Sequence, residues 1–171
     1  MAMNAALLPE YDHELATTRI VLERLPEHKY GWKPHPKSMS MGDLATHLSN
    51  LPQWAAMTMA ADDLDLAPGG VPVKQDPAVK TRAELLEKFD KNVSEGRAAI
   101  AAADDASMMK SWSLKMNGAT LMTMPKAAVL RSWVMNHVVH HRAQLAVYLR
   151  LNDVAVPAMY GPSADEGSMG S

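Results

Sequence analysis

The sequence predicts an all-α fold, a four-helix bundle in up-down-down-up order with a long crossover connection between the second and third helices. Three observations predict it. Apolar residues recur at steps of three and four over four segments, as on one face of a helix. Proline- and glycine-rich stretches separate these segments. Helices of roughly 20 residues are roughly 30 Å long, which suits a bundle, and a long connection allows the middle two helices to run parallel.

The first helix is expected over residues 4–25, because a single apolar stripe runs through this segment. Pro26 ends the helix, and a proline-rich connection follows as far as residue 39. The residues of the stripe are Leu8, Tyr11, Leu15, Thr18, Leu22 and Leu25.

The second helix is expected from Ser40 to about residue 61, since the apolar spacing continues that far. Ser40 and Asp43 have the spacing of a capping box, in which each side chain binds a free backbone N–H at the helix start. The inward stripe contains His47 and Trp54 among its apolar residues. Pro52 falls inside the stripe, so we expect a bend there.

The third helix is expected over residues 81–102, after a long connection that spans residues 62–80 and is rich in proline and glycine. Thr81 and Glu84 have the spacing of a second capping box. Gly96 lies in the middle of this helix, where glycine lowers helix stability. We therefore expect the helix to be weakest there.

The fourth helix follows a less regular segment. Polar and apolar residues alternate over residues 111–116, and Asn117-Gly118 is a turn signal, so we expect a short irregular or hairpin-like excursion. Pro125 suits the first turn of a helix that extends to about residue 151. We expect one domain over residues 1–165 and a disordered tail over residues 166–171.

Composition excludes several classes of protein. The net charge is −2 and lysines and arginines do not cluster, which removes the usual electrostatic reason to expect a nucleic acid partner. No apolar segment is long enough to span a membrane. The sequence contains no cysteine, so any metal ligand or nucleophile must be another residue. These features predict a cytoplasmic protein without nucleic acid or membrane partners.

Two histidines share the inward face of the fourth helix. With His137 at zero on a helical wheel, His141 lies at about +40°, whereas Arg142 and other arginines fall on the far side. Neutral imidazoles are good ligands for divalent transition metals, and two of them at positions i and i+4 can bind one ion. His47 supplies a third ligand from the second helix. Three histidines leave a coordination position open, as in catalytic sites.

Other residues fit the site less specifically. Trp54, Trp133 and Tyr148 are expected to line a pocket around the ion, although ordinary core packing explains them equally well. His140 lies on the flank of the helix, as a hydrogen-bond partner of the ligands or as a surface residue. The role of His13, next to the first apolar stripe, stays open. The alternative for the three histidines themselves is a hydrogen-bonded core position.

Three blocks of the sequence resemble the DinB-like superfamily of metalloproteins: LATHL at 44–48, VPAMYGPS at 156–163, and the more specific NHVVHHRAQL at 136–145. The resemblance implies an up-down-down-up four-helix bundle, often a homodimer, with three histidines around one Ni²⁺ or Zn²⁺ ion. It assigns the ligand role to His47, His137 and His141 and leaves His140 outside the ligand set. Fe²⁺ and Mn²⁺ are further candidates for the ion.

The resemblance also implies an activity. Some members are metal-dependent transferases or isomerases that act with low-molecular-weight thiols, so we expect a metal-dependent thiol S-transferase whose partners are a small thiol and a small electrophile. An open metal position can lower the pKa of a thiol and favour the thiolate. Two alternatives remain: a non-catalytic metal-binding or stress-response bundle, and a metal-dependent hydrolase. For a hydrolase, the HxxxH segment contains no glutamate that could act as the general base.

Overall fold

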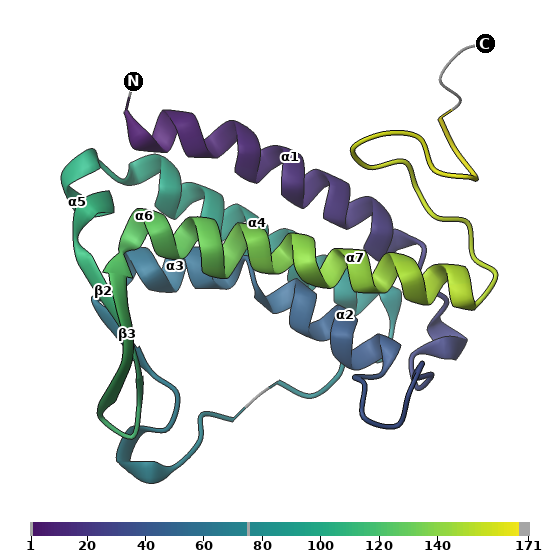
Figure 1. Cartoon of the computed structure of the whole chain (residues 1–171), viewed down its shortest axis with the longest axis horizontal. Coiled ribbons are helices and arrows are strands. Elements are labelled where there is room, and N and C mark those ends of the chain that lie inside the picture. The colour runs from purple at the N-terminus through teal and green to yellow at the C-terminus, as the bar shows by residue number, and fades with distance from the viewer. Residues whose placement is uncertain (1, 75, 168–171) are drawn as a thin grey trace.

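The structure is a computed structural model that describes residues 2–74 and 76–167 (Figure 1). Long helices lie side by side along the molecule, and a small sheet lies at one end (Figure 1). In chain order the elements are α1 (Met3–Glu23), η1 (Glu27–Lys29), α2 (Met41–Asn50), α3 (Gln53–Ala60), β1 (Asp63–Asp65), η2 (Pro68–Gly70), α4 (Arg82–Ala102), α5 (Asp105–Met109), β2 (Ser111–Met116), β3 (Ala119–Pro125), α6 (Lys126–Val129), η3 (Leu130–Met135) and α7 (Asn136–Leu151).

The sheet shows that the predicted all-α four-helix bundle is wrong, because the fold is mixed. Three strands are arranged in the order β1-β2-β3. Strands β2 and β3 form the antiparallel hairpin that the Asn117-Gly118 turn indicated, and both turn residues have positive φ. Strand β1 was not expected. It pairs with β2 in parallel, with Asp63 opposite Ser113, and three residues are too few to show an alternating pattern.

The Asp65 side chain fixes this short strand to the hairpin. Its carboxylate accepts hydrogen bonds from the backbone N–H groups of Asn117 (2.9 Å) and Gly118 (2.7 Å), and also from that of Ala67 (2.9 Å). The connection over residues 62–80 is therefore tied to the sheet at its start, where only a loop was predicted.

Hydrogen bonds between the long helices define their directions. Tyr11 donates to the Val93 carbonyl and Asn4 to the Ala101 carbonyl, so α1 and α4 run antiparallel. Val79, just before α4, donates its N–H to the Thr46 hydroxyl of α2, and Asn92, further along α4, donates to the Ser49 carbonyl at the end of α2. Helices α2 and α4 therefore run in the same direction. The long connection between α3 and α4 crosses the length of the molecule to allow this arrangement (Figure 1).

The helix starts follow the capping signals. Ser40 and Asp43 form a complete capping box at α2, and Thr81 and Glu84 form another at α4. Pro52 separates α2 from α3, because proline has no N–H to continue the hydrogen-bond ladder. Leu51 and Pro52 keep helical φ and ψ, so the side chains on either side of the break stay on a common face.

The last helix is not a regular α-helix throughout. It begins as α6 directly after Pro125, continues as the π-helix η3, and becomes α7 at Asn136. The sequence predicted one helix over this segment without the π-helical turn. The short helix α5, with Asp104 as its N-cap, was also not predicted.

The buried apolar side chains form two clusters. The larger one fills the space between the long helices and includes Leu15, Leu44, Phe89 and Leu145. The smaller one, with Trp112, Leu114 and Val129, lies between the hairpin and the start of the last helix. The candidate metal ligands therefore lie on helices whose positions are fixed by the larger cluster.

The segment after α7 returns to the helices. The guanidinium of Arg24 forms an ion pair with Glu166 (2.5 Å), and Arg150 pairs with Asp165. Residues 168–171, which make up most of the predicted disordered tail, lie outside the described residues. Among the described residues no helix combines the length and the hydropathy needed to cross a membrane.

Candidate metal centre

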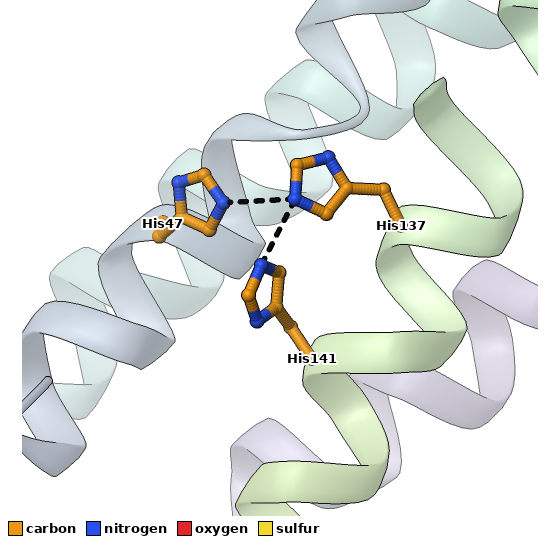
Figure 2. Close-up of side chains that lie close together, drawn as sticks. All are labelled: His47, His137 and His141. Atoms are coloured by element: carbon orange, nitrogen blue, oxygen red, sulfur yellow. Dashed lines mark hydrogen bonds between the residues drawn. The ribbon is translucent and has the colours of Figure 1, made fainter. Parts of the chain in front are cut away.

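Three histidine rings from two helices meet at one point (Figure 2). His47 belongs to α2, and His137 and His141 belong to α7. The Nε2 atom of His137 lies 2.9 Å from Nε2 of His141 and 3.4 Å from Nε2 of His47. One nitrogen from each ring lies within 4.8 Å of the other two. The structure thus brings together the three residues that the sequence selected as ligands.

Helix geometry and packing position these rings. His137 and His141 are one turn apart on the face of α7 that packs against α2, so both rings point toward that helix. His47 lies between the buried Leu44 and Leu48 on α2, whose start is fixed by the Ser40 capping box. The three residues are each partly buried, so the cluster keeps some contact with solvent.

The site favours neutral imidazoles. Burial lowers the pKa of His47 to about 4, and the neighbouring His141 and His137 contribute to the shift. Burial also lowers the pKa of His137 and that of His141, with a smaller contribution from nearby histidines in each case. Because a ring must be neutral to offer a lone pair to a metal, these environments prepare all three residues for that role.

Gln144 orients one of the rings. The Nδ1 atom of His141 donates to Oε1 of Gln144 (2.8 Å), since an amide oxygen can only accept. The amide nitrogen of Gln144 donates in turn to Nε2 of His140 (3.1 Å). His141 therefore carries its proton on Nδ1, and its Nε2 presents a lone pair to the other two histidines.

A divalent cation fits this arrangement better than hydrogen bonds among the rings. Nε2 of His137 faces the Nε2 atoms of both His47 and His141, and one proton on His137 cannot serve both contacts. Metal–nitrogen bonds of 2.0–2.1 Å in tetrahedral geometry place two ligand nitrogens about 3.3–3.4 Å apart. The contact between His137 and His47 has this length (3.4 Å), and the contact between His137 and His141 is shorter (2.9 Å). The residues present therefore fit a metal ion held by three neutral imidazoles.

A shallow hollow lies beside His137. Its lining consists of Ser132, Trp133, Asn136, His137 and His140. The indole of Trp133 meets the ring of His137 edge-on, with centroids 6.3 Å apart, and stacks in parallel on Trp54 of α3 with centroids 6.2 Å apart. The two predicted pocket tryptophans thus form one aromatic pair at the edge of the site.

Three other residues that the sequence singled out lie away from the three histidines or at the margin of their site. Tyr148 is buried against Trp32, and its hydroxyl donates to the Met39 carbonyl (3.2 Å). Its side chain therefore packs near the C-terminal end of α7 and does not line the site. His140 is exposed and contacts the ring of His141 (centroids 4.8 Å apart) as well as Gln144. His13 lies on the other side of the last helix, near the ring of Tyr160 (6.3 Å).

Sequence reasoning missed the roles of Gln144 and Arg142. On a helical wheel with His137 at zero, Gln144 lies at about −20°, next to the ligands, but spacing alone assigns no partner to it. Arg142 was placed on the far side of the helix, which suggested a solvated residue. It is 1% exposed and forms an ion pair with Glu14 of α1 (2.7 Å), because α1 covers that side of α7.

Solved structures with a similar fold include two DinB-like proteins. One, from Bacillus cereus, has a TM-score of 0.66 and 18% sequence identity, over 90% of this chain and 95% of that chain. The other, YjoA from Bacillus subtilis, has a TM-score of 0.68 and 18% identity, over 89% of this chain and 95% of that chain. At this identity the likeness concerns the fold.

Comparison of the sequence with curated proteins gave no match. The family model described as DinB family matches residues 1–168, a span that contains all three histidines and every described helix and strand. On the strength of that match, this protein belongs to the DinB family.

Proposed function

We propose that His47, His137 and His141 hold one divalent metal ion, Ni²⁺ or Zn²⁺, and that the fourth side of the ion is open to small molecules. The observation that supports this most strongly is the Nε2 atom of His137, which faces two other ring nitrogens at 2.9 Å and 3.4 Å. Three protein ligands with a partly exposed side correspond to a catalytic site rather than to a closed structural one.

We further propose that the protein transfers a low-molecular-weight thiol to a small electrophile. A divalent ion in this position supplies Lewis acidity, which lowers the pKa of a bound thiol. With an activated alkene, the sulfur forms a bond to one carbon as the carbon–carbon double bond opens. The proton of the thiol passes to solvent, and a proton returns to the neighbouring carbon.

The chain's own residues would hold the organic parts of these molecules. Trp133 offers an apolar surface next to His137, and Ser132 and Asn136 place polar groups on the same hollow. None of the residues that line this hollow is acidic, so a thiolate would approach without repulsion from a carboxylate. The identity of the thiol and of the electrophile, and a homodimeric state, stay predictions.

Metal content after reconstitution tests the first proposal. The protein is incubated with Ni²⁺ or Zn²⁺, dialysed and analysed for metal, and we expect about one ion per chain. His137→Ala should reduce this content at least tenfold, because His137 is the ring that contacts both others. His28→Ala is the control, since His28 lies exposed in η1 away from the site. Equal metal content in the two variants would refute the proposed ligand set.

Conjugation of small thiols to an activated alkene tests the second proposal. Several thiols are compared with the metal-loaded protein, the metal-free protein and His137→Ala. We expect turnover only with metal and an intact His137. Turnover that persists in His137→Ala would contradict metal-dependent transfer, and tight metal binding without any thiol turnover would favour a non-catalytic metal protein.

A further inference from the structure

Gln144 connects a candidate metal ligand to the surface of α7. It lies three residues after His141 and four after His140, so its side chain can reach both rings on the helix surface. Its Oε1 accepts from Nδ1 of His141 at 2.8 Å, and its Nε2 donates to Nε2 of His140 at 3.1 Å. Gln144 is partly buried, whereas His140 is exposed.

The two hydrogen bonds determine how the amide is oriented. If the amide were turned over, its NH₂ group would face the N–H of His141, and its oxygen, which can only accept, would face the lone pair of His140 Nε2. His140 therefore acts as the acceptor that keeps the Gln144 oxygen directed at His141. This gives the exposed His140 a role that its position on the flank of the helix did not reveal.

The hydrogen bond from His141 has a direct consequence for that ring. A neutral imidazole carries its proton on either nitrogen, and the partner of one nitrogen determines the tautomer. With Oε1 of Gln144 at Nδ1, the proton stays on Nδ1 and the ring plane is fixed. The lone pair of Nε2 then points toward His137, whose own Nε2 lies 2.9 Å away.

We propose that Gln144 is the positioning residue that holds His141 in its Nδ1–H tautomer, with His140 as the acceptor that fixes the Gln144 amide. The part of this inference that concerns metal affinity rests on the proposed function above. The part that concerns the tautomer does not, because it is a property of the metal-free protein.

Two substitutions separate the two hydrogen bonds of Gln144. Gln144→Leu removes both and leaves Nδ1 of His141 without an acceptor. Gln144→Glu retains an acceptor for His141 but loses the donor to His140. Gln53→Leu, on the exposed surface of α3, is the matched control for replacement of a glutamine by leucine. Circular dichroism checks that each variant is folded.

Two-bond ¹H–¹⁵N spectra of the metal-free proteins report the tautomer of His141. We expect the Nδ1–H form in the wild-type protein, in Gln144→Glu and in Gln53→Leu, and a shift toward the Nε2–H form in Gln144→Leu. A His141 that carries its proton on Nε2 in the wild-type protein would overturn the inference, and so would an unchanged tautomer in Gln144→Leu.

Affinity for Zn²⁺, measured by competition with a chelator, gives the second readout. Loss of a hydrogen-bond partner of a metal-bound histidine weakens metal binding by about 10–100-fold, and we expect a decrease of this size in Gln144→Leu and wild-type-like affinity in Gln144→Glu. Equal affinity in Gln144→Leu and wild type would overturn the role in metal binding. A wild-type protein that binds no metal but shows the expected tautomers would refute the proposed function and support Gln144 as the positioning residue.

Discussion

At the scale of single residues, burial and neighbouring side chains determine which form of each histidine is present. The three rings lie between helices, so water solvates their charged forms poorly and each pKa is lowered, that of His47 to about 4. A partly buried imidazole that stays neutral is a poor ion-pair partner and a good ligand. The same burial makes the metal-free protein sensitive to acid.

We predict that the metal-free protein loses stability as the pH falls from about 6.5 toward 4. In that range the unfolded chain binds protons that the folded histidines do not bind, so protonation favours unfolding. Stability should therefore be constant above pH 7 and decrease below it. Urea unfolding at pH 7.5 and 5.5 measures the change while the carboxylates remain ionised.

His47→Gln is the informative variant for this measurement, because it removes the group with the most strongly lowered pKa. The difference between the urea midpoints at the two pH values should be smaller in this variant than in the wild-type protein. A wild-type midpoint that is unchanged or higher at pH 5.5 would contradict the prediction.

The three ligand candidates could be predicted from the sequence because each follows from spacing. His137 and His141 are one helical turn apart, and His47 lies in an apolar stripe. Gln144 and Arg142 could not be assigned in this way. Their roles depend on which ring lies within hydrogen-bond distance and on whether α1 covers the second face of α7, and a single helical wheel contains neither fact.

At the scale of secondary-structure elements, Gly96 shows how packing changes the meaning of a residue. The sequence suggested a weak point in the third helix. In the structure α4 passes so close to its neighbours at this position that a Cβ would lie 2.4 Å from the Tyr11 hydroxyl and 2.6 Å from the Pro52 carbonyl oxygen. The absence of a side chain is what allows α4 to contact both α1 and the break between α2 and α3.

We predict that Gly96→Ala destabilises the protein by about 1–3 kcal/mol, the usual cost of adding atoms to a closely packed interior. Alanine is intrinsically the better helix former by about 1 kcal/mol, so helix propensity alone predicts the opposite sign. Chemical unfolding gives the free energy. Gly31→Ala serves as the control, since a Cβ at Gly31 meets no atom within 4 Å.

Local signals predicted some elements and could not predict others. The capping boxes at Ser40 and Thr81 and the turn at Asn117-Gly118 involve residues close together in sequence, and the structure contains each of them. At Pro52 the sequence predicted a bend within one helix, whereas the structure has a break between α2 and α3. Strand β1 was missed because it exists only through its pairing with β2, which lies about 50 residues later in the chain. A pattern within a few neighbouring residues contains no information about such a distant partner.

At the scale of the whole molecule, a buried polar group joins the last segment of the chain to the helices. Arg142 donates to Glu14 (2.7 Å) and to the hydroxyl of Tyr160 (2.5 Å), and this hydroxyl donates to Glu14 (2.7 Å). Tyr160 lies in the segment after α7, so the contact connects α1, α7 and that segment. The guanidinium and the carboxylate are almost completely buried.

We predict that Glu14→Ala lowers the free energy of unfolding by about 3–5 kcal/mol, because it leaves Arg142 charged, buried and without its anion. Glu10→Ala is the control. Glu10 also lies on α1 and also pairs with an arginine of the last helix, Arg131. Arg131 is exposed and Glu10 is partly exposed, so we expect a loss below about 1 kcal/mol. Chemical unfolding of both variants measures the difference. Similar losses of free energy in the two variants would contradict the prediction that the buried ion pair contributes more to stability than the exposed one.

The π-helical turn η3 lies between the two parts of the molecule, with the hairpin before it and the histidine-bearing α7 after it. Each residue of a helix rotates the chain by about 100°. One residue more or fewer in this turn would therefore swing the hairpin around the helix axis while α7 kept its contacts with α2. The number of residues in η3 therefore determines how the hairpin is oriented around the axis of the last helix.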